Sequence, residues 1–254
     1  MAGSAPIIPD IRSLQDGLQQ RFRDGVNQGA QATAFARLGD EVMLNDGYLE
    51  PFGSGAYQLG ENGDLQSIID WFNAAGSDGF NSFNRQVAGA GQGWRPVDLL
   101  DPGRADAALC DTGSGETPLG CELRRTQAAV ALIQVGYHSV GTADPDTFRT
   151  NMRAIIDSVT NYGAIPVLFT IRPGQDATGT AMLNDVIVQL GAEYRIPVIN
   201  AWRALNDLPN PALNAAPSGA GDLSVGATGS AGLNALNLVT LRTLDLLRAL
   251  VFNA

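Results

Sequence analysis

The sequence has 254 residues, 44% of them hydrophobic, and a chain of this length and composition can bury one sizeable core. Its 16 basic and 26 acidic residues give a formal net charge of -10, which repels polyanions and excludes nucleic acid as an expected partner. Every basic residue is an arginine, so Schiff-base chemistry and a lysine general base are excluded as well.

The predicted location follows from the apolar runs and the cysteines. No apolar run approaches the length of a membrane span, and the first ten residues lack the basic region and apolar core of a signal segment, so we expect a soluble chain. The two cysteines, Cys110 and Cys121, bracket a stretch rich in turn-forming residues, which favours a disulfide and therefore an extracellular or secreted protein. Two unlinked thiols on a loop, or a metal bound by the pair, are the alternatives.

In the first half of the chain, apolar residues at helical spacing predict a helix from Ile11 to Val26. A short strand over 34–38 ends where the chain must turn at Gly39. Asp64 is the expected N-cap of a helix that ends near residue 76. Residues 76–125 are rich in Gly, Pro, Ser and Asp, so we predict mostly loop there, with one helical turn around 97–100.

The second half alternates strands and helices. The expected strands cover 128–135, 165–171 and 196–200, and the expected helices cover 144–163, 178–194 and 236–250. This order predicts a three-layer α/β/α domain with an open, mostly parallel sheet over residues 31–254, on which the helical segment 1–30 packs. Ligands bind beyond the carboxyl ends of such strands, so the loops after Leu38, Val135, Ile171 and Asn200 are the expected site.

Several segments resemble one known family in order and context. They are Phe35–Glu41, the Cys110 to Cys121 loop, Val135–Gly141 with the helix and strand that follow it, the Pro197 segment, and the final helix from Asn237. Together they are similar to the blocks of SGNH (GDSL-type) hydrolases. The resemblance implies a flavodoxin-like α/β fold and a site at Glu41, His138, Asp222 and Gly89.

The residues at these positions depart from the family pattern. Glu41 stands where the family carries its nucleophilic serine, and His138 stands where it carries an asparagine that stabilises the oxyanion. Asp222 takes the place of the orienting aspartate, with Val225 replacing the base, or Asp222 itself takes the place of the base. Gly89 is the counterpart of the family glycine that lends a backbone N–H.

The histidine count bears directly on the chemistry. A serine hydrolase needs a general base near neutral pKa, and the one histidine of this chain lies in a different block. Ser139 in Tyr137–Gly141 also resembles a nucleophile elbow, but no histidine follows it. The sequence thus predicts a secreted SGNH-fold pseudoenzyme without a cofactor, with a cleft for a carbohydrate, an ester or a protein.

Alternatives at the same positions remain open. Glu41, His138 and Asp222 are candidates for a divalent metal site or an acid–base pair that hydrolyses esters, and Glu41 and His138 are otherwise expected to be simply hydrogen-bonded together. The neighbours of these residues are candidate ligand contacts. Asp40 is expected to cap the helix that follows it, and Tyr137 and Ser139 are expected to face a ligand.

Overall fold

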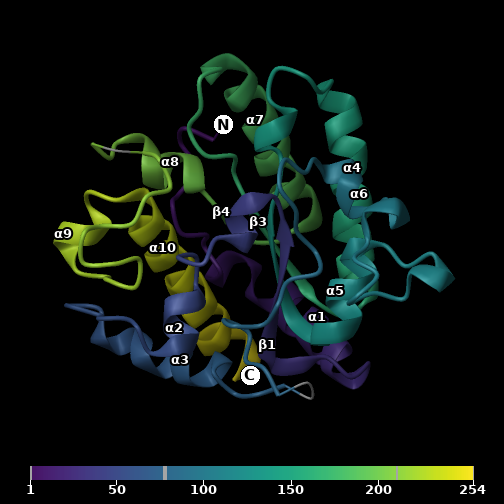
Figure 1. Ribbon diagram of the computed structural model, residues 1–254, viewed down its shortest axis with the longest axis horizontal. Helices are drawn as coiled ribbons and strands as arrows, with labels where there is room; N and C mark the ends of the chain where they lie inside the picture. The colour runs from purple at the N-terminus through teal and green to yellow at the C-terminus, as the bar shows by residue number, and fades with distance from the viewer. Residues whose placement is uncertain (1, 77–78, 210, 254) are drawn as a thin grey trace.

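The computed structural model describes residues 2–76, 79–209 and 211–253, and its centre is a parallel sheet (Figure 1). In the described residues the sheet has four strands in the order β1-β2-β3-β4. The strands are β1 (Gln31–Gly39), β2 (Ala128–Gln134), β3 (Ile165–Phe169) and β4 (Val198–Ile199). All neighbouring pairs are parallel, which confirms the predicted α/β sheet.

Helices cover both faces of the sheet because strand side chains alternate between two hydrophobic cores. Phe35, Leu132 and Val167 belong to one core, and Leu38, Ile133 and Leu168 belong to the other. The first core is covered by α1 (Gln15–Asn27), α3 (Gln66–Phe72) and α10 (Gly232–Leu247). The second is covered by α5 (Pro118–Thr126), α6 (Pro145–Asn161) and α7 (Ala177–Tyr194).

Short elements complete the domain. The short α-helices are α2 (Glu50–Ser54), α4 (Pro96–Leu99), α8 (Ala201–Asn206) and α9 (Val225–Thr228). The 3-10 helices are η1 (Arg12–Leu14), η2 (Glu41–Leu44), η3 (Gly63–Leu65), η4 (Pro102–Arg104), η5 (Thr112–Ser114) and η6 (Tyr137–Ser139). A π-helical turn, η7 (Arg248–Phe252), follows α10 and contacts α1 through the stacked rings of Phe22 and Phe252.

Two local predictions were wrong. Asp64 does not cap the helix that follows it, because its carboxylate pairs with Arg242 of α10 and the chain enters α3 through η3. The prediction of mostly loop over residues 76–125 was wrong at the end of that segment, because α5 begins at Pro118, but the helical turn predicted around 97–100 is present as α4. The buried Glu122 interrupts the apolar pattern of α5, and this side chain accepts hydrogen bonds from the backbone N–H groups of Ala88 and Arg37.

No helix in the described part of the chain is long and apolar enough to span a bilayer.

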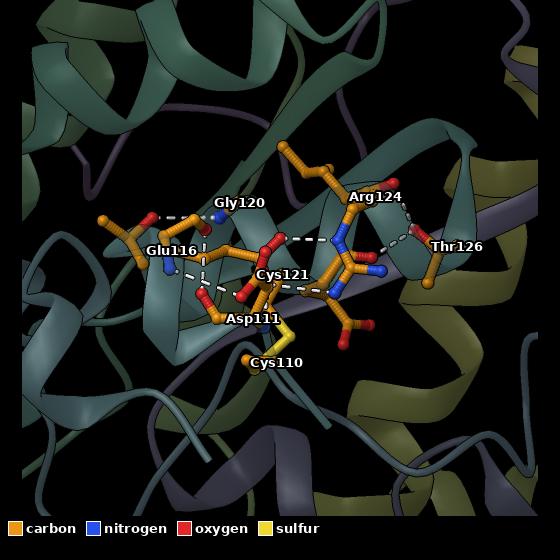
Figure 2. Close-up of polar contacts among 11 residues, drawn as sticks. Cys110, Asp111, Glu116, Gly120, Cys121, Arg124 and Thr126 are labelled. Carbon is orange, nitrogen blue, oxygen red and sulfur yellow. Dashed lines mark hydrogen bonds and ion pairs between the residues drawn. A yellow bond between two sulfur atoms is a disulfide. The ribbon is translucent and has the colours of Figure 1, made fainter. Parts of the chain in front are cut away.

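A disulfide fastens the loop before α5 to that helix (Figure 2). Cys110 and Cys121 are bonded with their Cα atoms 5.3 Å apart, which confirms the predicted disulfide and excludes free thiols and a metal held by the pair. Glu116 lies beside them and accepts two hydrogen bonds from Arg124, at 2.6 and 2.9 Å, and one from the backbone N–H of Asp111. The loop is therefore held to α5 at two adjacent points.

Replacing both cysteines by serine is expected to lower the free energy of unfolding by about 2–3 kcal/mol, because the crosslink closes a short loop and restricts the unfolded chain. Urea unfolding with and without a reductant measures this effect. The reductant should destabilise the wild type and leave the double variant unchanged. Equal stability of the oxidised wild type and the double variant would contradict the structural role of the crosslink.

Candidate functional site

The chain turns sharply at the carboxyl end of β1. Gly39 has a φ of +155°, and a Cβ at this position would lie 1.9 Å from the carbonyl oxygen of Gln134 on β2, so only glycine fits. Asp40 follows and accepts a hydrogen bond from the backbone N–H of Val42 at 3.2 Å. The expected capping role of Asp40 is therefore confirmed, for a 3-10 helix. The cap directs the next side chain, Glu41, away from the core.

The end of β2 brings the histidine to this carboxylate. Gly136 has a φ of +133°, and a Cβ there would approach the side chain of Ile171 to 2.9 Å. The chain then forms η6, from which the Nε2 atom of His138 lies 2.8 Å from the Oε2 atom of Glu41. Because an ionised carboxylate can only accept, Nε2 carries the proton in this hydrogen bond.

Two further groups bind the same carboxylate. The Nη2 atom of Arg172, which follows β3, donates to Oε1 of Glu41 at 3.0 Å. The backbone N–H of Gly93 donates to Oε2 at 3.3 Å. Sequence reasoning missed both residues, although Arg172 lies in the loop after Ile171, one of the four loops expected to form the site.

The ring of Tyr137 is packed between other groups. The guanidinium carbon of Arg172 lies 3.4 Å from the centroid of the ring, a close cation–π contact. Gly174 lies against the ring as well, because a Cβ at that position would approach Tyr137 Cε2 to 3.1 Å. These contacts hold the arginine in place for its ion pair with Glu41. The guanidinium therefore covers one face of the ring.

The electrostatics of the two adjacent carboxyl groups differ. Burial raises the pKa of Glu41, but hydrogen bonds from its own backbone N–H, from His138 and from Gly93 outweigh burial and bring the pKa below its usual value. The neighbouring Asp40 is almost fully buried, and burial together with the nearby Glu41 charge raises its pKa to about 7. Glu41 is thus held as an anion, and Asp40 changes charge near neutral pH.

The structure does not join Asp222 to this group. Its carboxylate accepts hydrogen bonds from the hydroxyl of Ser218 and from the backbone N–H of Ser224, the latter at 2.9 Å. No hydrogen bond or ion pair in the described residues connects it with Glu41 or His138, and the three do not form a cluster of metal-ligand spacing there.

The remaining predicted site residues have structural contacts. Gly89 lies beside β1, where its carbonyl oxygen accepts a hydrogen bond from the backbone N–H of Gly39, and Gly93 supplies the N–H that reaches Glu41. Ser139 is 1% exposed. Within the described residues the ring of His138 has a hydrogen bond only with Glu41 and none with a hydroxyl group.

Replacing Asp40 by asparagine tests the raised pKa. A carboxyl group with a raised pKa binds its proton more tightly in the folded chain than in the unfolded one. This preference stabilises the folded chain at low pH, and the stabilisation is lost as the pH rises through the pKa of the folded chain. We expect the wild type to lose about 2–3 kcal/mol of unfolding free energy between about pH 5 and pH 8, and Asp40→Asn to lose much less. The lowered pKa of Glu41 acts below this window. Urea titrations at both pH values measure the difference.

Asp207 is exposed, so Asp207→Asn is the matched control. The free energy of unfolding of this variant should have the same pH dependence as that of the wild type. Identical pH dependence in Asp40→Asn and the wild type would contradict the assignment.

Comparison with solved structures relates the fold of this chain to a known one. No protein-family profile and no curated protein matches the sequence. Among solved structures, the chain is similar to a G-D-S-L family protein described as lipolytic from Desulfitobacterium hafniense DCB-2, with a TM-score of 0.53, 13% identity, and coverage of 83% of this chain and 99% of that one.

It is also similar to a lipase/acylhydrolase from Enterococcus faecalis, with a TM-score of 0.50, 16% identity, and coverage of 84% of this chain and 95% of that one. The parallel sheet and its helical layers match these structures. The chain therefore has the fold of the GDSL, or SGNH, hydrolases.

Proposed function

We propose that this protein is a secreted pseudoenzyme with the SGNH fold, which binds a ligand and does not hydrolyse esters through a serine. One observation carries the proposal. Arg172, His138 and the N–H of Gly93 all bind the carboxylate of Glu41, the residue that the sequence resemblance puts at the position of the family nucleophile.

Acyl transfer by this fold needs a hydroxyl nucleophile, a base within hydrogen-bonding reach of it, and free donors for the oxyanion. Glu41 offers no hydroxyl, and its negative charge is already balanced by the neighbouring Arg172. The one histidine of the chain donates to Glu41, and within the described residues its ring has no hydrogen bond with a hydroxyl group. The backbone N–H of Gly93, a group of the kind that stabilises an oxyanion, is also bound to Glu41.

A secreted location is supported by the Cys110–Cys121 disulfide, because such bonds form and persist mainly in oxidising compartments. A retained ligand site is supported by two pockets on either side of the Tyr137 to Ser139 turn. Ser139 lines one of about 300 Å³, and Tyr137 lines the other, of about 220 Å³. Polar side chains contribute to both, including Asp144 in the first and Asp176 in the second. These linings suit a polar ligand such as a carbohydrate.

A second candidate function is hydrolysis by a rebuilt site. The 2.8 Å hydrogen bond between Glu41 and His138 favours it, because a carboxylate that orients an imidazole is a common arrangement for a general base. In that case His138 would activate a water molecule and Glu41 would be a positioning residue. Asp222 has no part in this version, since its hydrogen bonds go to Ser218 and Ser224.

Turnover of short p-nitrophenyl esters separates the two candidates. We expect the purified protein to hydrolyse them no faster than an equal concentration of its Glu41→Ala or His138→Ala variant, because no activated nucleophile is present. Glu61→Ala, at an exposed position, is the matched control. A saturable rate that either site variant abolishes and the control retains would overturn the pseudoenzyme and establish the rebuilt hydrolase.

A further inference from the structure

A third pocket, of about 320 Å³, lies beside β1 and shares no lining residue with the group around Glu41. It is bounded by the chain that leaves η2, by the start of α2, and by the segment 83–87 that leads toward Gly89. Its volume is at the lower end of the range for small-molecule sites, about 300–1,000 Å³. The pocket therefore suits a ligand of few atoms.

The inner wall carries a buried cation. Arg37 extends from β1 and is only 6% exposed. Of its guanidinium nitrogens, Nη2 donates to the carbonyl oxygen of Arg85 at 2.7 Å. Among the described residues no carboxylate lies within 4.0 Å of this guanidinium, although a buried charge is costly without a partner. Arg37 thus offers charged donors to the pocket.

The surroundings of Arg37 leave this charge only partly balanced. The buried Glu122 lies nearby, but its oxygens accept from the backbone N–H groups of Ala88 and Arg37, not from the guanidinium. Arg85 also lines the pocket, and its Nη1 and Nη2 atoms donate to the carbonyl oxygens of Arg125 and Phe80. The guanidinium of Arg37 is the group in the inner wall that attracts an anion.

The rim of the pocket has the opposite charge. Glu50, the first residue of α2, and the exposed Asp46 both line it. Burial lowers the pKa of Arg37, and the charges of Glu122 and Glu50 partly oppose this effect, so Glu50 lies close enough to act on the guanidinium without forming a direct ion pair. A simple anion would be repelled at the rim, and a simple cation would be repelled at the inner wall.

Apolar side chains also line the pocket. Leu44 is 36% exposed and Val87 is half-buried, so both present accessible apolar surface there. Such surfaces gain free energy by contact with an apolar group of a ligand. The pocket thus combines a buried cation, carboxylates at its rim and apolar surface.

We propose that this pocket binds a small zwitterion of the α-amino acid type with an apolar side chain. The carboxylate of the ligand pairs with Arg37, its ammonium group pairs with Glu50 and Asp46, and its side chain packs on Leu44 and Val87. The ligand completes the ion pair that Arg37 and Glu50 do not make directly.

Isothermal titration calorimetry of the full chain with L-leucine, L-methionine and L-phenylalanine tests the proposal. Two leucine analogues are matched probes: 4-methylpentanoate lacks the ammonium group, and 3-methylbutylamine lacks the carboxylate. We expect saturable binding of at least one amino acid, and binding of both leucine analogues that is about 10- to 100-fold weaker than that of leucine if leucine is bound. Absence of saturable heat for all three amino acids up to roughly 10 mM would overturn the proposal. Equal binding of 4-methylpentanoate and leucine would do the same.

Two variants locate the binding. Glu50→Gln at the rim keeps the size of the side chain, and we expect it to weaken amino acid binding about tenfold or more. Arg37→Gln should abolish the binding, with circular dichroism used to check that this variant folds. Glu61→Gln, an exposed carboxylate that does not line the pocket, should bind as the wild type does. Wild-type affinity in Glu50→Gln would overturn the assignment even if Arg37→Gln fails to fold.

The amino acid binding experiments test this pocket separately from the function proposed for the site around Glu41. His138 belongs to the other site and does not line this pocket, so His138→Ala should leave amino acid binding unchanged, whatever its effect on ester turnover. Loss of binding in His138→Ala would show that the amino acid occupies the other site and would overturn the proposal.

Discussion

The ion pair between Glu41 and Arg172 is the interaction on which the rest of the site depends. A carboxylate at the end of β1 is partly buried, and such a charge is stable only with partners that balance it. Arg172 follows β3, and His138 follows β2. Three neighbouring strands are therefore joined at their carboxyl ends by one acidic side chain. In the hydrolases of this fold, that end of the sheet carries the reacting groups.

The same carboxylate affects its neighbours. Its negative charge, with burial, keeps a proton on Asp40 up to about neutral pH. Its pair with Arg172 holds that guanidinium where it stacks on one face of the Tyr137 ring. An ion pair of this kind fixes a geometry more than it adds net stability. The charge of Glu41 is thus balanced by neighbours that also fix its position.

Much of the fold could be predicted from the sequence because the strands and long helices have clear apolar patterns. The continuous apolar run of β2 and the single stripe of α6 were sufficient to place both elements. The helix α5 could not be predicted, because Glu122 is buried in it and is satisfied by backbone groups more than 30 residues away in the chain. Patterns of hydrophobicity carry no information about such distant partners.

The site shows the same limit. Placing Glu41 and His138 after two parallel strands led to the expectation that they are hydrogen-bonded together, and the structure has that bond. Arg172 is separated from Glu41 by 131 residues, and nothing in its own segment marks it as a partner of a carboxylate. Asp222 was placed with the other two by resemblance alone, but its loop provides its own hydrogen-bond donors, Ser218 and Ser224.

The central claim is that the imidazole of His138 donates the proton on its Nε2 atom to Glu41. His138 is the one histidine of the chain, so the imidazole region of a ¹H–¹⁵N NMR spectrum reports on it without ambiguity. The account predicts that the hydrogen bond to Glu41 slows exchange of the Nε2 proton with water. The Nε2–H resonance should therefore be visible in the wild type and lost in Glu41→Ala. An imidazole whose Nε2 atom is unprotonated, or whose resonance is the same in both proteins, would contradict the account.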